Sequence, residues 1–360
     1  MVSSTTLQRS GEQVETNFNP ENKISFSRFS DRKPRLLVVS DLESTKWGNV
    51  NGFRGKCDPK QRRANAEAFN AISQDAFIVD ATGQAIESVQ GHNLDQVEPF
   101  HHVDIFSTNN GMQIFTNEIG KNPTKFLEEL KPETDENKDW KNYIENFLMF
   151  PGSKLLKAFR TALTKLGFSK TKEIGENPNG RTYAYQNHEV WEHGDSPIPF
   201  TLCSETNVLA ALNDNTEEEI AIARNFLQKI IREVTNSLKG VRGYLAEQLP
   251  FCIFAPFVPQ KEENHISKSS LIPAILKLAP DGFWSDLDAI ICLGDSGNDE
   301  HLGLSEVQKP GSKQMLPVYK VIAGDKLNGV EWIPNDGRIK VSSTKGDIAR
   351  ELTQTVQEAT

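Results

Sequence analysis

The sequence predicts an α/β protein with a doubly wound parallel sheet and an inserted α+β domain. Short apolar runs alternate with helical segments near both ends of the chain, which is the pattern of a parallel sheet covered by helices. Between about residues 117 and 258 the alternation stops, and longer helices and strand-like pieces replace it. We therefore predict a core domain of residues 35–116 and 259–360 and a cap domain of residues 117–258.

The first half of the sheet is predicted from three apolar runs, at residues 36–40, 76–79 and 103–106. The run at 36–40 is short, contains two adjacent valines and follows Pro34, so it reads as a strand buried on both faces. Helical spacing is present at 62–72, and a second helix is expected at 85–89. Residues 1–34 are rich in small polar and acidic side chains, which predicts a mobile N-terminal segment.

The remaining elements follow from the same signals. In the cap, helices are expected at 153–166 and 216–238, and strands at 181–186, 199–203 and 251–257. In the second half of the core, helices are expected at 270–278 and 346–356, and strands at 287–293, 318–322 and 339–341.

Composition limits the function classes. The chain has 360 residues with a net charge of -9, which argues against a general nucleic-acid binder because phosphate contacts need clustered Lys and Arg. No apolar run approaches the length of a membrane span, and the first ten residues lack a hydrophobic signal core. The four cysteines form no Cys-x-x-Cys pair, so reduced thiols and a cytoplasmic location are expected. Oligomeric state leaves no sign in the sequence.

Acidic residues follow two strands that are far apart in the sequence. Asp41 and Glu43 follow the run at 36–40, and Asp295 and Asp299 follow the run at 287–293. Ligands of open α/β sheets bind beyond the carboxyl ends of the strands, so these acids are expected to converge there. Converging carboxylates repel one another unless a cation lies between them, and an all-oxygen ligand set favours Mg²⁺. Taken singly, such acids are more often turn residues.

Two further residues have the chemistry to hold a phosphate group. Thr82 ends the second strand, where its hydroxyl and amide could bind phosphate at the following helix start, although a helix N-cap is the simpler interpretation. Lys268 could supply a compact positive charge, although a lone lysine is usually solvated. The order and spacing of all the segments together favour the functional interpretation.

These segments resemble the motifs of the haloacid dehalogenase-like phosphatase superfamily, over most of residues 35–350. Asp-Leu-Glu-Ser-Thr from Asp41 resembles the first motif, Asp-x-Asp-x-Thr, and Thr-Gly-Gln from Thr82 resembles the second. Lys268 resembles the third, and Gly-Asp-Ser-Gly-Asn-Asp at 294–299 is similar to the fourth and is the most specific. The position of the insertion is similar to that of the type-2 cap branch. Within it, sucrose-phosphate phosphatase-like and Cof-type sugar phosphatases look most similar.

The resemblance implies a Rossmann-like core, a role for each matched residue and a phosphorylated small-molecule substrate. Asp41 would attack phosphorus and form an aspartyl-phosphate, and Glu43 would act as acid and base. Mg²⁺ would be held by Asp41, Asp295 and the Glu43 carbonyl, with Asp299 completing or supporting the site. The remaining roles are phosphate binding by Thr82 and Lys268, and substrate binding by Asn110 and Gly111, which match an Asn-Gly element of the branch.

The sequence departs from the family pattern at two positions. Glu43 stands where Asp is usual, although enolase-phosphatases also carry Asp-x-Glu, and Gln84 stands where Arg is usual. Besides an active phosphatase, two alternatives therefore stay open. One is a weak or inactive relative that binds a phosphorylated ligand or a protein partner. The other is a receiver-like phosphoacceptor, against which the insertion and the late 294–299 loop count.

Overall fold

The structure, a computed structural model, describes the chain in a series of segments. These are residues 26–29, 31–46, 58–83, 102–108, 113–116, 128–129, 154–167, 169–173, 181–185, 188–192, 201–204, 217–239, 241–245, 251–258, 261–265, 268–295, 299–324, 337–344 and 346–360. The helix expected at 85–89 and the predicted site residues Asn110 and Gly111 lie outside these segments, as does Gln84.

Strand β1 (Leu36–Ser40) lies in the middle of the larger sheet and is buried along its whole length. It pairs in parallel with β2 (Ala76–Ala81) on one side and with β13 (Ala289–Gly294) on the other. The two runs that precede the acidic residues therefore belong to one sheet, as predicted. Because β2 continues the chain on one side while β13 returns from far along it on the other, their carboxyl ends flank a topological switch point.

The order of the larger sheet is β14-β15-β13-β1-β2-β3-β4-β5, with β16 paired to β15. The pairs β2–β3, β13–β15 and β15–β16 are parallel, while antiparallel pairs lie toward the edges. This mainly parallel sheet confirms the predicted fold class. The other strands are β3 (Ile105–Thr108), β4 (Gln113–Thr116), β5 (Glu128–Glu129), β14 (Glu306–Gln308), β15 (Met315–Ile322) and β16 (Ile339–Val341).

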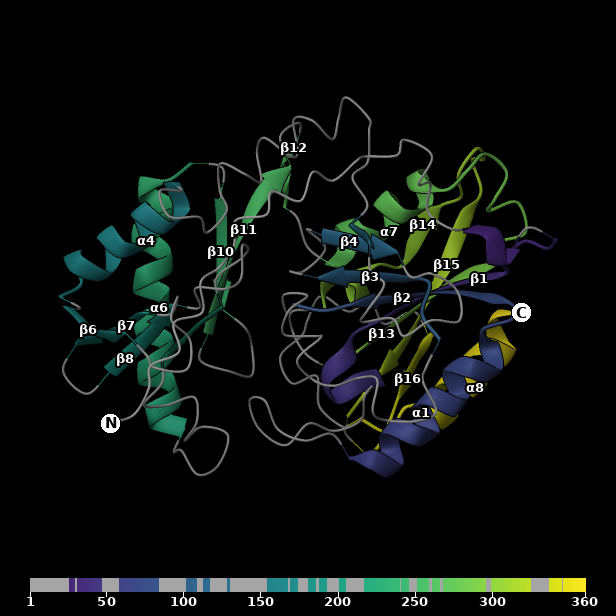
Figure 1. Cartoon of the computed structure of the whole chain (residues 1–360), viewed down its shortest axis with the longest axis horizontal. Coiled ribbons are helices and arrows are strands. Elements are labelled where there is room, and N and C mark those ends of the chain that lie inside the picture. Colours follow the sequence, from purple (N-terminus) through teal and green to yellow (C-terminus); the bar gives the residue numbers. More distant parts are fainter. Residues whose placement is uncertain are drawn as a thin grey trace, which may run out of the picture.

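Helices cover both faces of the larger sheet. Helices α1 (Pro59–Ile72) and α8 (Ala349–Ala359) run side by side, whereas α7 (Lys268–Leu278) lies apart from them (Figure 1). Successive side chains of a strand point to opposite faces, so β1 contributes to two cores. On the α1 and α8 side the core includes Leu36, Val38, Phe69 and Leu352. On the α7 side it includes Leu37, Val39, Leu271 and Ile275.

The starts of helices α1, α7 and α8 differ from the sequence predictions by two or three residues. Helix α1 begins at Pro59 instead of residue 62, because Asp58 accepts hydrogen bonds from the amides of Lys60 at 2.8 Å and Gln61 at 3.3 Å. Helix α7 begins at Lys268, which the sequence placed just before a helix at 270–278. Helix α8 begins at Ala349 and extends to Ala359.

The prediction that residues 1–34 form a mobile segment is wrong for the described residues at its end. Residues Phe26–Phe29 form the short helix η1, and Phe29 is buried in the core beside α7. The Phe29 ring meets the Phe283 ring edge-on at 5.8 Å between centroids. Arg28 forms an ion pair with Asp104 at 2.6 Å. Because the segment as a whole is polar, its composition did not indicate that residues 26–29 pack against the core.

A second sheet, of order β10-β11-β9-β8-β7-β6 with β12 paired to β11, is entirely antiparallel. Helix α6 (Glu217–Ser237) packs on it and against α4 (Lys154–Lys165) (Figure 1). The strands are β6 (Ser169–Glu173), β7 (Arg181–Tyr185), β8 (His188–Glu192), β9 (Thr201–Ser204), β10 (Val241–Leu245), β11 (Phe251–Val258) and β12 (Lys261–His265). The domain boundaries at 117 and 258 stay a prediction. Among the described residues, no helix combines the length and apolar character needed to cross a membrane.

Candidate active site

Asp41 lies where β1 ends and the helical turn η2 (Leu42–Lys46) begins. The Asp41 amide donates to the Leu293 carbonyl oxygen at 3.0 Å, which ties the end of β1 to the end of β13. The Lys46 amide points to the Asp41 carbonyl oxygen at 3.4 Å, an i to i−5 contact that gives the turn π-helical character. Such turns are rare and are often found at functional sites. Glu43 is the second residue of η2, and its side chain lies outside the described part of the chain.

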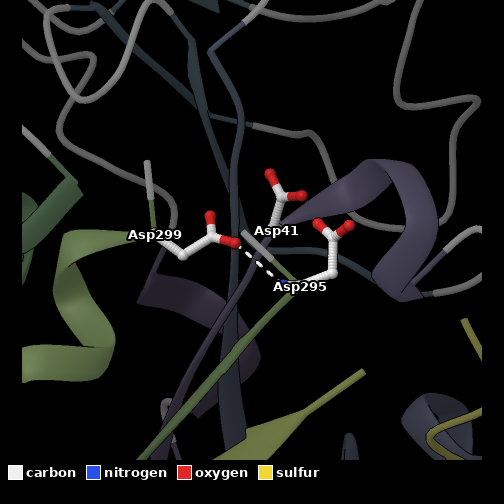
Figure 2. A group of neighbouring side chains, drawn as sticks. All are labelled: Asp41, Asp295 and Asp299. Carbon is white, nitrogen blue, oxygen red and sulfur yellow. Dashed lines mark hydrogen bonds between the residues drawn. The ribbon is translucent and has the colours of Figure 1, made fainter. Parts of the chain in front are cut away.

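The end of β13 brings two more carboxylates to the same edge of the sheet. The Asp295 amide donates to Asp299 Oδ2 at 2.9 Å, which holds these two residues together (Figure 2). Gly294 makes this approach possible, because a Cβ atom at that position would lie 2.5 Å from Asp299 Oδ2. Asp299 also precedes the short helix η5 (Glu300–Gly303).

The carboxylates of Asp41, Asp295 and Asp299 gather in one place, where one oxygen atom from each lies within 4.8 Å of the other two (Figure 2). The Lys268 ammonium at the start of α7 bridges two of them, at 2.6 Å from Asp41 Oδ1 and 2.6 Å from Asp299 Oδ1. Asp41, Asp299 and Lys268 are buried, and Asp295 is half-buried. Lys268 is thus not the solvated lysine of the simpler interpretation.

The charges of this cluster do not balance. Burial raises the pKa of Asp41 well above its ordinary value, and Asp299 and Asp295 raise it further against the opposing charge of Lys268. Burial alone would lower the pKa of Lys268, but the carboxylates of Asp299 and Asp41 outweigh burial and raise it. Among these four groups, one ammonium therefore faces three carboxyl groups.

A divalent cation fits the residues that are present. The donor set is carboxylate oxygen, which suits Mg²⁺ better than zinc, and the three carboxyl groups outnumber the one ammonium that contacts them. Both oxygens of Asp299 already accept hydrogen bonds, from Lys268 and from the Asp295 amide. Asp299 is thus suited to orient the loop, while Asp41 and Asp295 are the better placed direct ligands.

Thr82 follows β2 just as Asp41 follows β1. The two strands are in register with Ser40 beside Asp80, so Thr82 reaches the same edge of the sheet. Thr82 is buried, and its amide donates to the Ser107 carbonyl oxygen at 2.9 Å, so this amide already has a partner. The phosphate-binding role of Thr82 stays a prediction that depends on its hydroxyl.

Sequence reasoning missed a second buried charge pair beside this site. Lys46, the last residue of η2, forms an ion pair with Asp80 of β2, and neither side chain is exposed. The signal was present, because Asp80 interrupts an apolar run at the end of a strand and Lys46 follows the motif that begins at Asp41. Neither residue could be paired with the other from sequence spacing alone.

Solved structures of haloacid dehalogenase superfamily phosphatases match this chain across most of its length. The sucrose-phosphatase of Synechocystis sp. PCC6803, solved with sucrose and phosphate, has 13% identity and a TM-score of 0.48, over 90% of this chain and 98% of that one. The C-terminal domain of Candida albicans trehalose-6-phosphate phosphatase has 13% identity and a TM-score of 0.47, over 92% and 94%.

A haloacid dehalogenase-like hydrolase from Bacillus subtilis has 12% identity and a TM-score of 0.46, over 91% of this chain and 92% of its own. No protein-family model matches the sequence, and no curated protein matches it. The assignment of chemistry therefore depends on the residues gathered at the ends of β1 and β13.

Proposed function

We propose that this chain is a Mg²⁺-dependent phosphatase that hydrolyses a small phosphorylated metabolite through an aspartyl-phosphate. The observation that carries the proposal is the cluster of Asp41, Asp295 and Asp299 with Lys268 at the switch point of the sheet. A sugar phosphate is the proposed substrate class, because the motifs resemble those of sucrose-phosphate phosphatase-like enzymes most closely.

Mg²⁺ would be held by Asp41, Asp295 and the Glu43 carbonyl oxygen, with Asp299 holding the loop in place. When bound, the ion supplies positive charge that keeps Asp41 ionised and neutralises phosphoryl oxygens. Asp295→Asn removes one charged ligand and is expected to weaken Mg²⁺ binding without unfolding the core. Titration calorimetry with Mg²⁺ measures this, and unchanged affinity would remove Asp295 from the proposed metal site.

The chain's own residues supply the rest of the chemistry. A carboxylate oxygen of Asp41 forms a bond to phosphorus, the bond from phosphorus to the ester oxygen breaks, and Glu43 donates a proton to the departing oxygen. Glu43 then takes a proton from water as that water attacks phosphorus and releases Asp41. Lys268 and Thr82 offer positive charge and a hydroxyl to the phosphoryl oxygens. Asn110 and Gly111 are proposed to contact the remainder of the substrate.

A phosphate-release screen against sugar phosphates and an activated aryl phosphate, with and without Mg²⁺, tests the proposal. Wild type should release phosphate only with the metal, and Asp41→Asn should release none because the amide is not a nucleophile. Equal rates in these two proteins would remove Asp41 from the mechanism. If wild type hydrolyses no phosphate ester, the chain is instead an inactive relative that binds a phosphorylated ligand or a protein.

A further inference from the structure

Lys46 occupies a position where an ammonium group needs specific partners. Its side chain is fully buried, and its Nζ atom donates to Asp80 Oδ1 and, at 3.2 Å, to the His102 carbonyl oxygen. The same atom lies 4.3 Å from the centre of the Phe69 ring, close enough for a cation–π contact. A buried ammonium is costly unless it is paired and hydrogen-bonded, so these three contacts restrict Lys46 to one place.

The partner carboxylate belongs to the strand that leads to the predicted phosphate-binding residue. Asp80 is fully buried in β2, lies beside Ser40 of β1 and precedes Thr82 by two residues. Lys46 closes η2, the turn whose second residue is Glu43. The ion pair therefore connects the turn that carries the proposed acid and base to the strand that leads to Thr82.

Asn65 of α1 holds the same end of the turn from another direction. Its side-chain amide donates to the Thr45 carbonyl oxygen at 2.9 Å and to the Gly346 carbonyl oxygen at 2.7 Å. Its own oxygen accepts from the Ile348 amide at 3.2 Å. The start of the turn is fixed through Asp41, and its end is thus fixed by two buried side chains on α1 and β2.

We propose that Lys46 is a positioning residue, which holds Glu43 in reach of the leaving group through the buried ion pair with Asp80. This inference rests on the proposed function for its catalytic part. A general acid must lie within hydrogen-bonding distance of the oxygen it protonates, and a displacement of about 1 Å can cost on the order of 100-fold in rate.

Hydrogen–deuterium exchange of the full-length protein tests the structural part without any substrate. The variants are Lys46→Met, the shape-conserving pair Lys46→Met/Asp80→Leu, and the control Arg28→Met, which removes a different ion pair next to β2. Replacing both partners by apolar side chains leaves no unpaired buried charge, so the double variant is expected to fold. The peptide 41–46 should exchange faster than in wild type in the double variant but not in the control. Equal exchange of this peptide in wild type, the double variant and the control would overturn the proposal.

The proposed effect of Lys46 on catalysis is tested by comparing substrates whose leaving groups differ in their need for a proton. Glu43 also activates the water that hydrolyses the aspartyl-phosphate, a step common to all substrates, so the test compares kcat/KM, which reports the steps up to release of the alcohol. Protonation in those steps matters for an alkyl phosphate and little for an activated aryl phosphate, so a displaced Glu43 lowers kcat/KM selectively for the alkyl phosphate. The ratio of aryl to alkyl kcat/KM should rise about tenfold or more in the Lys46 variants and stay unchanged in Arg28→Met. A parallel loss of both kcat/KM values would overturn the positioning role. No turnover by wild type would overturn the proposed function and this catalytic part together, while exchange still decides whether Lys46 holds the turn.

Discussion

At the scale of single residues, Asp41 combines burial with two neighbouring carboxylates. Its pKa is raised in the folded protein by burial and by the charges of Asp299 and Asp295, so folding disfavours its ionised form. Asp41→Asn removes that charge and is expected to increase the free energy of unfolding at pH 7 by on the order of 1 kcal/mol without Mg²⁺. Urea unfolding in the presence of a chelator measures the difference.

The stability gain expected for Asp41→Asn depends on pH. Because the folded-state pKa of Asp41 lies above its ordinary value of 3.8, the penalty is present above the folded-state pKa and vanishes below 3.8, where the carboxyl is protonated in both states. The advantage of Asp41→Asn should therefore disappear as the pH falls to that range. Mg²⁺ should also stabilise wild type more than the variant. A variant less stable than wild type at pH 7 would contradict this electrostatic account.

At the scale of elements, the ion pair between Arg28 and Asp104 attaches η1 to the start of β3. Asp104 Oδ2 also accepts from the Ile78 amide of β2 at 2.8 Å. Burial alone would raise the pKa of Asp104, but hydrogen bonds and charges from His102 and Arg28 outweigh it and lower the pKa. Asp104→Asn is expected to lower the free energy of unfolding by about 3 kcal/mol at pH 7, since Arg28 then loses its charged partner.

Because the pKa of Asp104 is lowered in the folded state, the direction in which pH changes the stabilisation by this ion pair is determined. Its stabilisation is present above the unfolded value of 3.8 and is lost as the pH falls below it through the folded-state pKa. The gap between wild type and Asp104→Asn in urea unfolding should close over that acidic range. Asp288→Asn is a matched control, because its pair with Arg35 is largely exposed and should contribute less than about 1 kcal/mol. A gap that persists at the lowest pH would contradict the assignment.

Elements with strong hydrophobic patterns could be predicted from the sequence, whereas the polar strands β12 and β14 could not. The runs that form β1, β2 and β13 are continuous and buried on both faces, so their apolar residues mark them directly. Strand β14 alternates between exposed and half-buried residues, and β12 reads Lys-Glu-Glu-Asn-His. Their extended conformation depends on pairing with a neighbouring strand, which a local sequence window does not contain.

Some features of the candidate site could likewise be predicted from the sequence, and others could not. Asp41, Asp295 and Asp299 were predictable together because they follow apolar strands, and parallel strands end at the same edge. The pairing of Lys46 with Asp80 was not predictable, since it joins residues 34 positions apart whose burial depends on packing against Phe69. Gly294 was part of a recognised motif, but its role in admitting Asp299 required the three-dimensional geometry.

At the scale of the whole molecule, the site is assembled from segments far apart in the sequence. Lys268 and Asp41 are 227 positions apart, yet their side chains are 2.6 Å apart. The second sheet, with α4 and α6 packed beside it, supplies none of the residues in this cluster among the described part of the chain. Cation binding should therefore stabilise one part of the molecule and not the other.

Hydrogen–deuterium exchange with and without Mg²⁺ measures this division directly. A ligand that binds only the folded state stabilises by RT ln(1 + [L]/Kd), about 2.7 kcal/mol at a concentration 100 times the Kd. Peptides from β1, β13 and the start of α7 should gain protection from exchange, because their local opening separates the carboxylates that hold the ion. Peptides from β7, β8 and α6 should not change if the second sheet opens independently. Uniform protection of both sheets would show that they unfold as one unit, and would contradict the predicted division into core and cap.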